Sequence, residues 1–220
     1  MLGVDPITLV VGLSLLALAP FAAVMVTSYV KLVVVFSLLR NALGIQQIPS
    51  NMVLNSMAIL LTLFVMAPVG YDMMAVARET GLTEAKSAGD LDSGMIGRVA
   101  EPLRMFLEKH AHPSMRILFL RAAMQLWGDN PDRAPDPEGF FILAPAFMLT
   151  ELTQAFQIGF LLYLPFVVVD LVISNILLAM GMMMVSPMTI SLPFKLLLFV
   201  MINGWTRVIE GLLLTYRGGG

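Results

Sequence analysis

The stretch from residue 161 to residue 205 constrains the fold of this chain most, because it is almost wholly apolar and yet repeatedly interrupted. The interruptions are prolines and charges, namely Pro165, Pro187, Pro193, Asp170 and Lys195. A simple lipid-facing anchor needs neither. Broken helices and ionisable side chains persist at bilayer depth where protein packs around them or where they line a cavity. We therefore expect this stretch to form the wall of a conduit, with helix breaks at the three prolines.

Composition places the chain among membrane proteins. Of its 220 residues, 58% are hydrophobic and only 13% are charged, which lies outside the usual globular balance. The formal net charge of −2 gives no indication of a nucleic-acid partner, so membrane lipid is the expected surrounding. The chain has no cysteine, which excludes disulfides, thiol catalysis and thiolate metal sites.

Long uncharged runs indicate where the hydrophobic helices lie. Asp, Glu, Lys and Arg are all absent from 6–30, 41–71, 152–169 and 171–194. Each run approaches or exceeds the roughly 20 residues that span a hydrocarbon core. We expect four hydrophobic helices, near 7–38, 52–77, 141–186 and 190–214. The third exceeds one span and is expected to bend at Pro165, while Gly159 and Gly181 are expected at helix contacts. Residues 1–6 contain neither Lys nor Arg, so we expect no cleavable signal peptide there.

A polar region separates the apolar segments. Within it, Val99, Leu103 and Phe106 recur at helical spacing, which predicts an amphipathic helix whose apolar stripe faces protein. We expect an all-α membrane protein in three parts. These are a hydrophobic helical hairpin over 1–77, a small amphipathic insertion over 78–139, and proline-broken hairpins over 140–220.

Motifs for catalysis or cofactor binding are absent. The sequence contains no GxxxxGK[ST], HExxH or GxSxG, so P-loop, zincin and serine-hydrolase chemistry is not indicated. His110 and His112 form an HxH pair without a nearby third ligand, which favours a surface or capping role over metal binding. We expect no cofactor, no metal site and no enzymatic activity.

Two alternative functions fit part of the pattern. Asp72 and Asp170 are the carboxylates of an intramembrane aspartyl protease hypothesis, but Asp170 lies in VVVDLVIS rather than in a GxGD sequence. Structural ion pairs explain such carboxylates more simply. A small oligomeric secondary transporter is the stronger competitor, because broken helices and intramembrane charges are typical of transporters. Against it, four helices are few and no inverted repeat is visible.

Longer segments resemble one known family. The segments 27–68 (TSYVKLVVVFSLLRNALGIQQIPSNMVLNSMAILLTLFVMAP) and 164–205 (LPFVVVDLVISNILLAMGMMMVSPMTISLPFKLLLFVMINGW) resemble the two signature blocks of the FliP/SctR family. EPLRMFLEKH (101–110) and FFILAPAFMLTELTQAFQIGF (140–160) also match its pattern. Members are export-apparatus proteins of flagellar and virulence type III secretion systems. The wording SNILLAMGMMMVSP is closer to the injectisome, or SctR, branch.

The resemblance implies an assembly and a gate. Family members join SctS-like and SctT-like subunits in a closed, helically arranged export gate of the bacterial inner membrane. Several copies of the subunit, about five in the family, surround a channel for unfolded secreted proteins. The methionine gasket of the family corresponds to Met182, Met183 and Met184 here. Gly181 before them and Pro187 after them fit a bent loop that projects into the channel.

The chemistry of methionine supports such a gate independently. Flexible, unbranched thioethers close a constriction by excluding water and yield when a chain passes. The alternative is that these methionines simply face lipid or the core.

Charges in apolar segments need partners. Glu151 and Lys195 are opposite charges in apolar surroundings. We expect them to pair between neighbouring copies, with Asp170 as the rival partner of Lys195.

Overall fold

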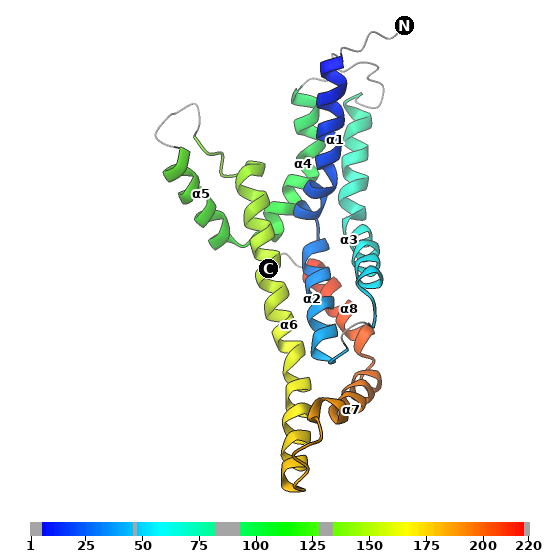
Figure 1. The fold of residues 1–220 in the computed structure, drawn as a ribbon. Helices are drawn as coiled ribbons and strands as arrows, with labels where there is room; N and C mark the ends of the chain where they lie inside the picture. The colour runs from blue at the N-terminus through cyan, green and yellow to red at the C-terminus, as the bar shows by residue number, and fades with distance from the viewer. Residues whose placement is uncertain (1–5, 46–47, 82–92, 128–133, 218–220) are drawn as a thin grey trace.

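Helix is the only regular secondary structure in the described part of the chain. The computed structural model describes residues 6–45, 48–81, 93–127 and 134–217 (Figure 1). The helices are α1 (Pro6–Val26), α2 (Tyr29–Ala42), α3 (Asn51–Glu79), α4 (Ser93–His110), α5 (Pro113–Trp127), α6 (Phe140–Ala179), α7 (Pro187–Met201) and α8 (Gly204–Arg217). The all-α class predicted from the sequence is confirmed, whereas assembly into a ring stays a prediction.

The centre of the fold is α2, which packs against α3, α6 and α8. Its side chains Leu32, Phe36 and Leu39 are almost completely buried. The crossing with α6 is close because Gly159 has no side chain: a Cβ there would lie 2.2 Å from Leu38 Cδ1. Gly159 is therefore the helix-contact glycine that the sequence predicts.

Aromatic rings extend this core from α6 to α2. The Phe166 ring in α6 lies 6.4 Å from that of Phe199 in α7. Phe199 in turn contacts Trp205 in α8 at 5.5 Å, and Trp205 contacts Phe36 in α2 at 6.2 Å. These edge-to-face and tilted ring contacts hold α7 and α8 against α6 and α2.

The longest helix, α6, continues through its prolines. Its 40 residues extend for about 60 Å, which is twice a hydrocarbon core. Pro165 lies inside α6 and Pro193 inside α7, so the breaks predicted at these two prolines are wrong. Neighbouring groups and local adjustment satisfy the backbone carbonyl that a proline frees in an apolar helix. Pro187 is the first residue of α7 and follows a real break, since proline suits the first helical position.

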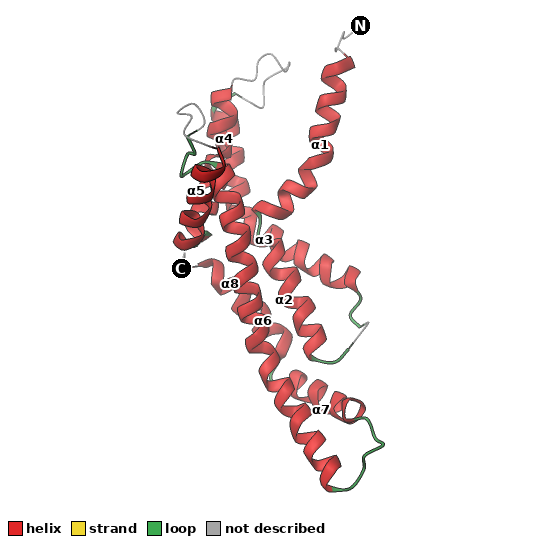
Figure 2. Cartoon of the chain, turned by 60° about the vertical axis from the view of Figure 1, so that its left-hand side comes forward, coloured by secondary structure: helices red, strands yellow, loops and turns green. Residues whose placement is uncertain are grey.

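Two of the four predicted hydrophobic helices are instead bent pairs. The segment from Pro20 turns by 78° between α1 and α2, and α7 and α8 meet at 60°. The second bend passes through Asn203, whose φ is +52°, a conformation that asparagine tolerates better than most residues. Figure 2 shows α1 leaning away from the other helices and α7 folding back along α6.

The inserted helices share a core with both hydrophobic parts of the chain. Phe106 of α4 is buried in a cluster with Leu143 and Phe147 of α6, and Val65 of α3 packs against the same cluster. Val99 is half-buried. The apolar stripe of α4 therefore faces protein, as predicted. The division into three domains stays a prediction.

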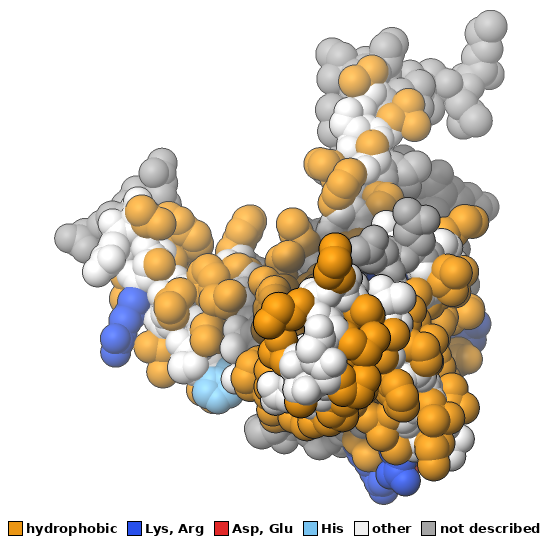
Figure 3. Space-filling model, turned by 60° about the horizontal axis from the view of Figure 1, so that its bottom comes forward, with side chains coloured by type: hydrophobic (Ala, Val, Ile, Leu, Met, Phe, Trp, Pro, Cys, Tyr) orange, Lys and Arg blue, Asp and Glu red, His pale blue; other side chains and the backbone are white. Residues whose placement is uncertain are grey.

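Large hydrophobic side chains also cover much of the surface. Figure 3, viewed from the end where α6 and α7 meet, shows them over most of that face. Phe64 on α3, Phe160 on α6 and Val200 on α7 are all exposed, and so much exposed apolar surface indicates lipid or other chains around it. Two helices, α3 and α6, are long and apolar enough to cross a membrane, or up to four segments if each bent pair is one span. The chain is thus a membrane-embedded component.

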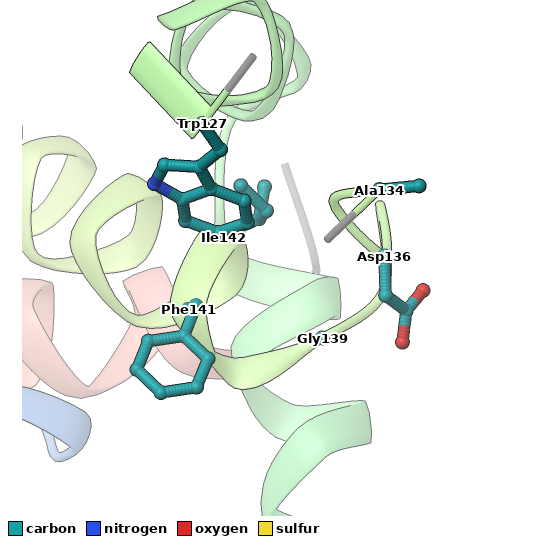
Figure 4. Close-up of a pocket in the computed structure, with 6 residues that line it drawn as sticks. All are labelled: Trp127, Ala134, Asp136, Gly139, Phe141 and Ile142. Atoms are coloured by element: carbon teal, nitrogen blue, oxygen red, sulfur yellow. The ribbon is translucent and has the colours of Figure 1, made fainter. Parts of the chain in front are cut away.

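An apolar hollow of about 400 Å³ lies between the end of α5 and the start of α6. Trp127, Phe141 and Ile142 line it, and Figure 4 shows Asp136 turned away from the two aromatic rings. The Asp136 carboxylate instead accepts a hydrogen bond from the Glu138 backbone N–H at 3.0 Å. The hollow therefore presents no polar group suited to chemistry among these residues.

Candidate functional site

The methionine loop, defined as residues 180–186, begins with a helix cap that only glycine suits well. Met180 is the C-cap residue that follows α6, and Gly181 comes next with φ +71°. The Met182 N–H donates to the Leu177 carbonyl at 2.9 Å, and the Gly181 N–H donates to the Leu178 carbonyl at 3.0 Å. These two bonds form a Schellman motif, which needs a left-handed residue at the position of Gly181. The bent loop predicted from the sequence is present, whereas the helix contact predicted at Gly181 is wrong, since a Cβ there would meet no atom within 4 Å.

The cap decides which methionines project. Met182 stays close to the end of α6 and is 39% exposed, whereas Met183 is 82% exposed and Met184 is 101% exposed. Ser186 and Pro187 then start α7. Of the four methionines in the loop, Met183 and Met184 project, Met182 is partly covered and Met180 is 62% exposed. The loop lies at the tip of the hairpin made by α6 and α7 (Figure 1).

A polar network braces this hairpin behind the loop. Lys195 of α7 lies 2.6 Å from the Asp170 carboxylate of α6, and the Ser191 hydroxyl donates to the other oxygen of Asp170 at 2.6 Å. Lys195 also donates to the carbonyl of Ala42, the last residue of α2, at 3.3 Å. A cation at a helix C-terminus is favourable. One lysine thus joins α7 to both α6 and α2.

The predicted pair between Glu151 and Lys195 is wrong, since each residue has a different partner within the chain. Lys195 pairs with the rival, Asp170. The error comes from the position of the turn. Placing it at Pro187 would put Lys195 opposite residue 180, but α6 ends at Ala179 and the connection spans 180–186. Lys195 therefore lies opposite about residue 171.

Glu151 belongs to a second buried charge cluster. The Lys31 ammonium of α2 lies 2.7 Å from Glu151, and both side chains are only 1% exposed. The Tyr216 hydroxyl of α8 donates to the second Glu151 oxygen, and Lys31 lies 4.2 Å from the centre of the Tyr216 ring. Lys31 also donates to Thr215 at 3.4 Å. The cluster joins α2, α6 and α8 through one carboxylate and one cation.

His110 packs against this cluster from the insertion. Its ring lies 4.6 Å from that of Phe106 and 5.4 Å from that of Tyr216. Burial, with the positive charges of Lys109 and Lys31, lowers the pKa of His110 to about 4. The ring is therefore neutral at physiological pH.

His112 and Asp170 have structural roles, and the structure reveals no role for Asp72. The Ser114 N–H donates to His112 Nδ1 at 3.3 Å at the start of α5, which is the predicted capping role, whereas His110 instead packs against Phe106 and Tyr216. Asp170 is engaged by Lys195 and Ser191, so it does not form the carboxylate pair that protease chemistry requires. In the described ranges no three His, Asp or Glu side chains are grouped to hold a metal ion.

Sequence reasoning missed Lys31 and Tyr216. Lys31 carried a signal, because it is a lone charge between long apolar stretches and such a charge needs a partner. Tyr216 carried no comparable signal, since a tyrosine near a helix end is common at membrane interfaces.

Comparison with known proteins assigns the family. Residues 12–212 match the model of the FliP family. Yop proteins translocation protein R of Yersinia pestis is 54% identical over 217 residues, covering 97% of this chain and 98% of that protein. Hypersensitivity response secretion protein HrcR of Ralstonia nicotianae is 48% identical, covering 99% and 100%. Virulence protein YscR of Salmonella typhimurium is 45% identical, covering 96% and 97%. The chain belongs to the FliP family, in the same branch as these translocation and secretion proteins.

Proposed function

We propose that this protein is a core subunit of the type III secretion export gate, through which unfolded proteins cross the bacterial inner membrane. Its relatives are named for translocation, secretion and virulence, which favours protein export over a small-solute transporter. In this proposal the chain has a mechanical role and carries out no enzymatic step. It assembles with further copies of itself, about five in all by analogy with the family, and with SctS-like and SctT-like subunits.

The observation that carries the proposal is the methionine loop. Met183 and Met184 project from a tight glycine turn with almost no cover from their own chain. In a ring of copies, one such loop from each subunit would converge on the axis. Apolar side chains at a narrow point exclude water and ions, while the flexible thioethers rearrange around a passing chain.

The brace behind the loop fits the same role. Asp170, Ser191 and Lys195 fix α7 on α6, and Lys195 fixes both on the end of α2. A loop that must withstand the passage of polypeptides needs a rigid base, and charged hydrogen bonds supply directional contacts that apolar packing does not.

The test is a conductance measurement on the assembled complex in a planar bilayer. Replacing Met182, Met183 and Met184 together by alanine is expected to raise ion leakage while particle size stays normal. The matched control replaces three exposed methionines elsewhere, Met74, Met105 and Met124, by alanine and should stay sealed. Unchanged conductance of the loop variant in a complex of normal size would overturn the proposal.

A further inference from the structure

We propose that the methionine loop is a site of reversible oxidation, in which a peroxide converts Met183 and Met184 to sulfoxides and loosens the seal. The consequence for the seal rests on the proposed function, whereas the order of oxidation within the loop rests on the structure of the loop. The reactive groups are the two thioethers that project beyond the Schellman turn.

Access separates these two thioethers from the other methionines. The chain has 18 methionines, and several on helices are exposed in the single chain, such as Met52 on α3 and Met201 on α7. Those lie on apolar helix faces that lipid or neighbouring chains cover in a membrane. The loop is different, because it lies at the tip of the α6–α7 hairpin (Figure 1) and carries Met183 and Met184, the two most exposed methionines among the described side chains. In the proposed gate the constriction itself is dry, but the loop borders the water-filled channel beside it, from which an oxidant reaches the thioethers.

The methionines within the loop also differ in how exposed they are. Met182 follows Gly181 directly and its N–H is bonded to Leu177, which holds the residue against the end of α6 and leaves it 39% exposed. Met183 and Met184 lie farther from the end of α6 and are 82% and 101% exposed. Since thioether oxidation follows access of the oxidant, Met183 and Met184 should react before Met182.

The reaction is balanced without a cofactor. The thioether sulfur attacks one oxygen of hydrogen peroxide, an S–O bond forms and the O–O bond breaks. Sulfur loses two electrons. The oxygen atom that sulfur takes up releases its proton, and the other oxygen of the peroxide accepts this proton and leaves as water. The product is methionine sulfoxide, which methionine sulfoxide reductases return to the thioether, one enzyme for each epimer.

Oxidation removes the apolar character of the side chain, on which a dry constriction depends. A sulfoxide is polar and accepts hydrogen bonds, whereas a thioether is apolar. Sulfoxides around a narrow point would hold water there and lower the barrier to ions. Because each copy contributes its own loop, a ring multiplies the effect of a small change in one side chain.

The experiment treats the assembled complex in proteoliposomes with graded hydrogen peroxide and stops the reaction with catalase. Peptide mass spectrometry then measures the gain of about 16 Da at each methionine, and conductance is recorded on parallel samples. We expect Met183 and Met184 to be oxidised several times faster than Met182 and Met201. Conductance should rise with their oxidised fraction toward that of the triple alanine variant. Incubation with both sulfoxide reductases should reverse the rise.

Two variants identify the responsible side chains. The Met183→Leu, Met184→Leu double variant, compared with its own untreated sample, should lose the peroxide-dependent rise. The Met105→Leu, Met124→Leu double variant removes exposed methionines of the insertion and should keep it.

Slower oxidation of Met183 and Met184 than of helix methionines would overturn the inference. So would oxidised loops that do not leak in a complex whose triple alanine variant does leak. If the triple alanine variant itself stays sealed, the proposed gate fails instead, while the measured order of oxidation still tests the selectivity.

Discussion

The pair between Lys31 and Glu151 is expected to be one of the most sensitive contacts of the fold. Glu151→Gln keeps the shape of the side chain but leaves the Lys31 ammonium without its counter-ion in a site that is only 1% exposed. Breaking a buried pair on one side costs about 3–5 kcal/mol, which is a factor of roughly 10²–10⁴ in the folding equilibrium. Tyr216→Phe removes a single hydrogen bond to the carboxylate and should cost about 1.5–3 kcal/mol.

The assay is equilibrium unfolding of the purified protein in mixed micelles, followed by helical circular dichroism. Glu108→Gln is the matched control, because Glu108 pairs with Arg116 at 3.1 Å in a partly exposed position and such a pair contributes about 0–1 kcal/mol. The Lys31→Met, Glu151→Gln double variant buries no net charge and should recover most of the loss. The reasoning is refuted if Glu151→Gln costs no more than the control, or if the double variant is no better than the single one.

Three other contacts give independent tests. Asp170→Lys and Lys195→Asp should each reduce the amount of assembled complex on native gels, and the double swap should partly restore it; no recovery would contradict the pairing seen here. Gly181→Ala places a side chain at φ +71° at a cost of about 1–2 kcal/mol and should raise leakage, whereas Gly70→Ala in open space within α3 should not. In the folded protein the pKa of His110 is about 4, below its ordinary value of 6.5, so the unfolded chain binds more protons between these values. The neutral His110 ring therefore contributes its full stability above pH 6.5, and this stability is lost as pH falls toward 4. His110→Phe should make the free energy of unfolding less dependent on pH over this range, as measured by unfolding curves at a series of pH values.

Local signals were sufficient to predict the helical class and the loop. The long uncharged runs gave α3 and most of α6, and the sequence from Gly181 to Pro187 predicted a bent connection between two helices. Glycine and proline determine backbone conformation through their own geometry, so their effect can be read from a single position.

Which charged side chains pair could not be predicted in the same way, because the pairing depends on the residue at which a helical hairpin turns. A shift of a few residues in the assumed turn moves Lys195 from Asp170 to a position near the end of α6. The two acids and two lysines that the structure pairs are Glu151, Asp170, Lys31 and Lys195, and the apolar segments contain further charges such as Asp72. The sequence alone does not distinguish the possible pairings between them.

The positions of the two networks explain why so apolar a chain carries buried charges at all. Glu151 and Asp170 both lie on α6, about 28 Å apart along a straight helix. The first fixes α2 and α8 on this helix, and the second fixes α7. Where nearly every helix face is apolar, hydrophobic contacts are similar in many registers and specify none of them strongly. A carboxylate in apolar surroundings has only one place where a lysine meets it, so each pair selects a register. The register set by Asp170 is the one that decides where the methionine loop projects.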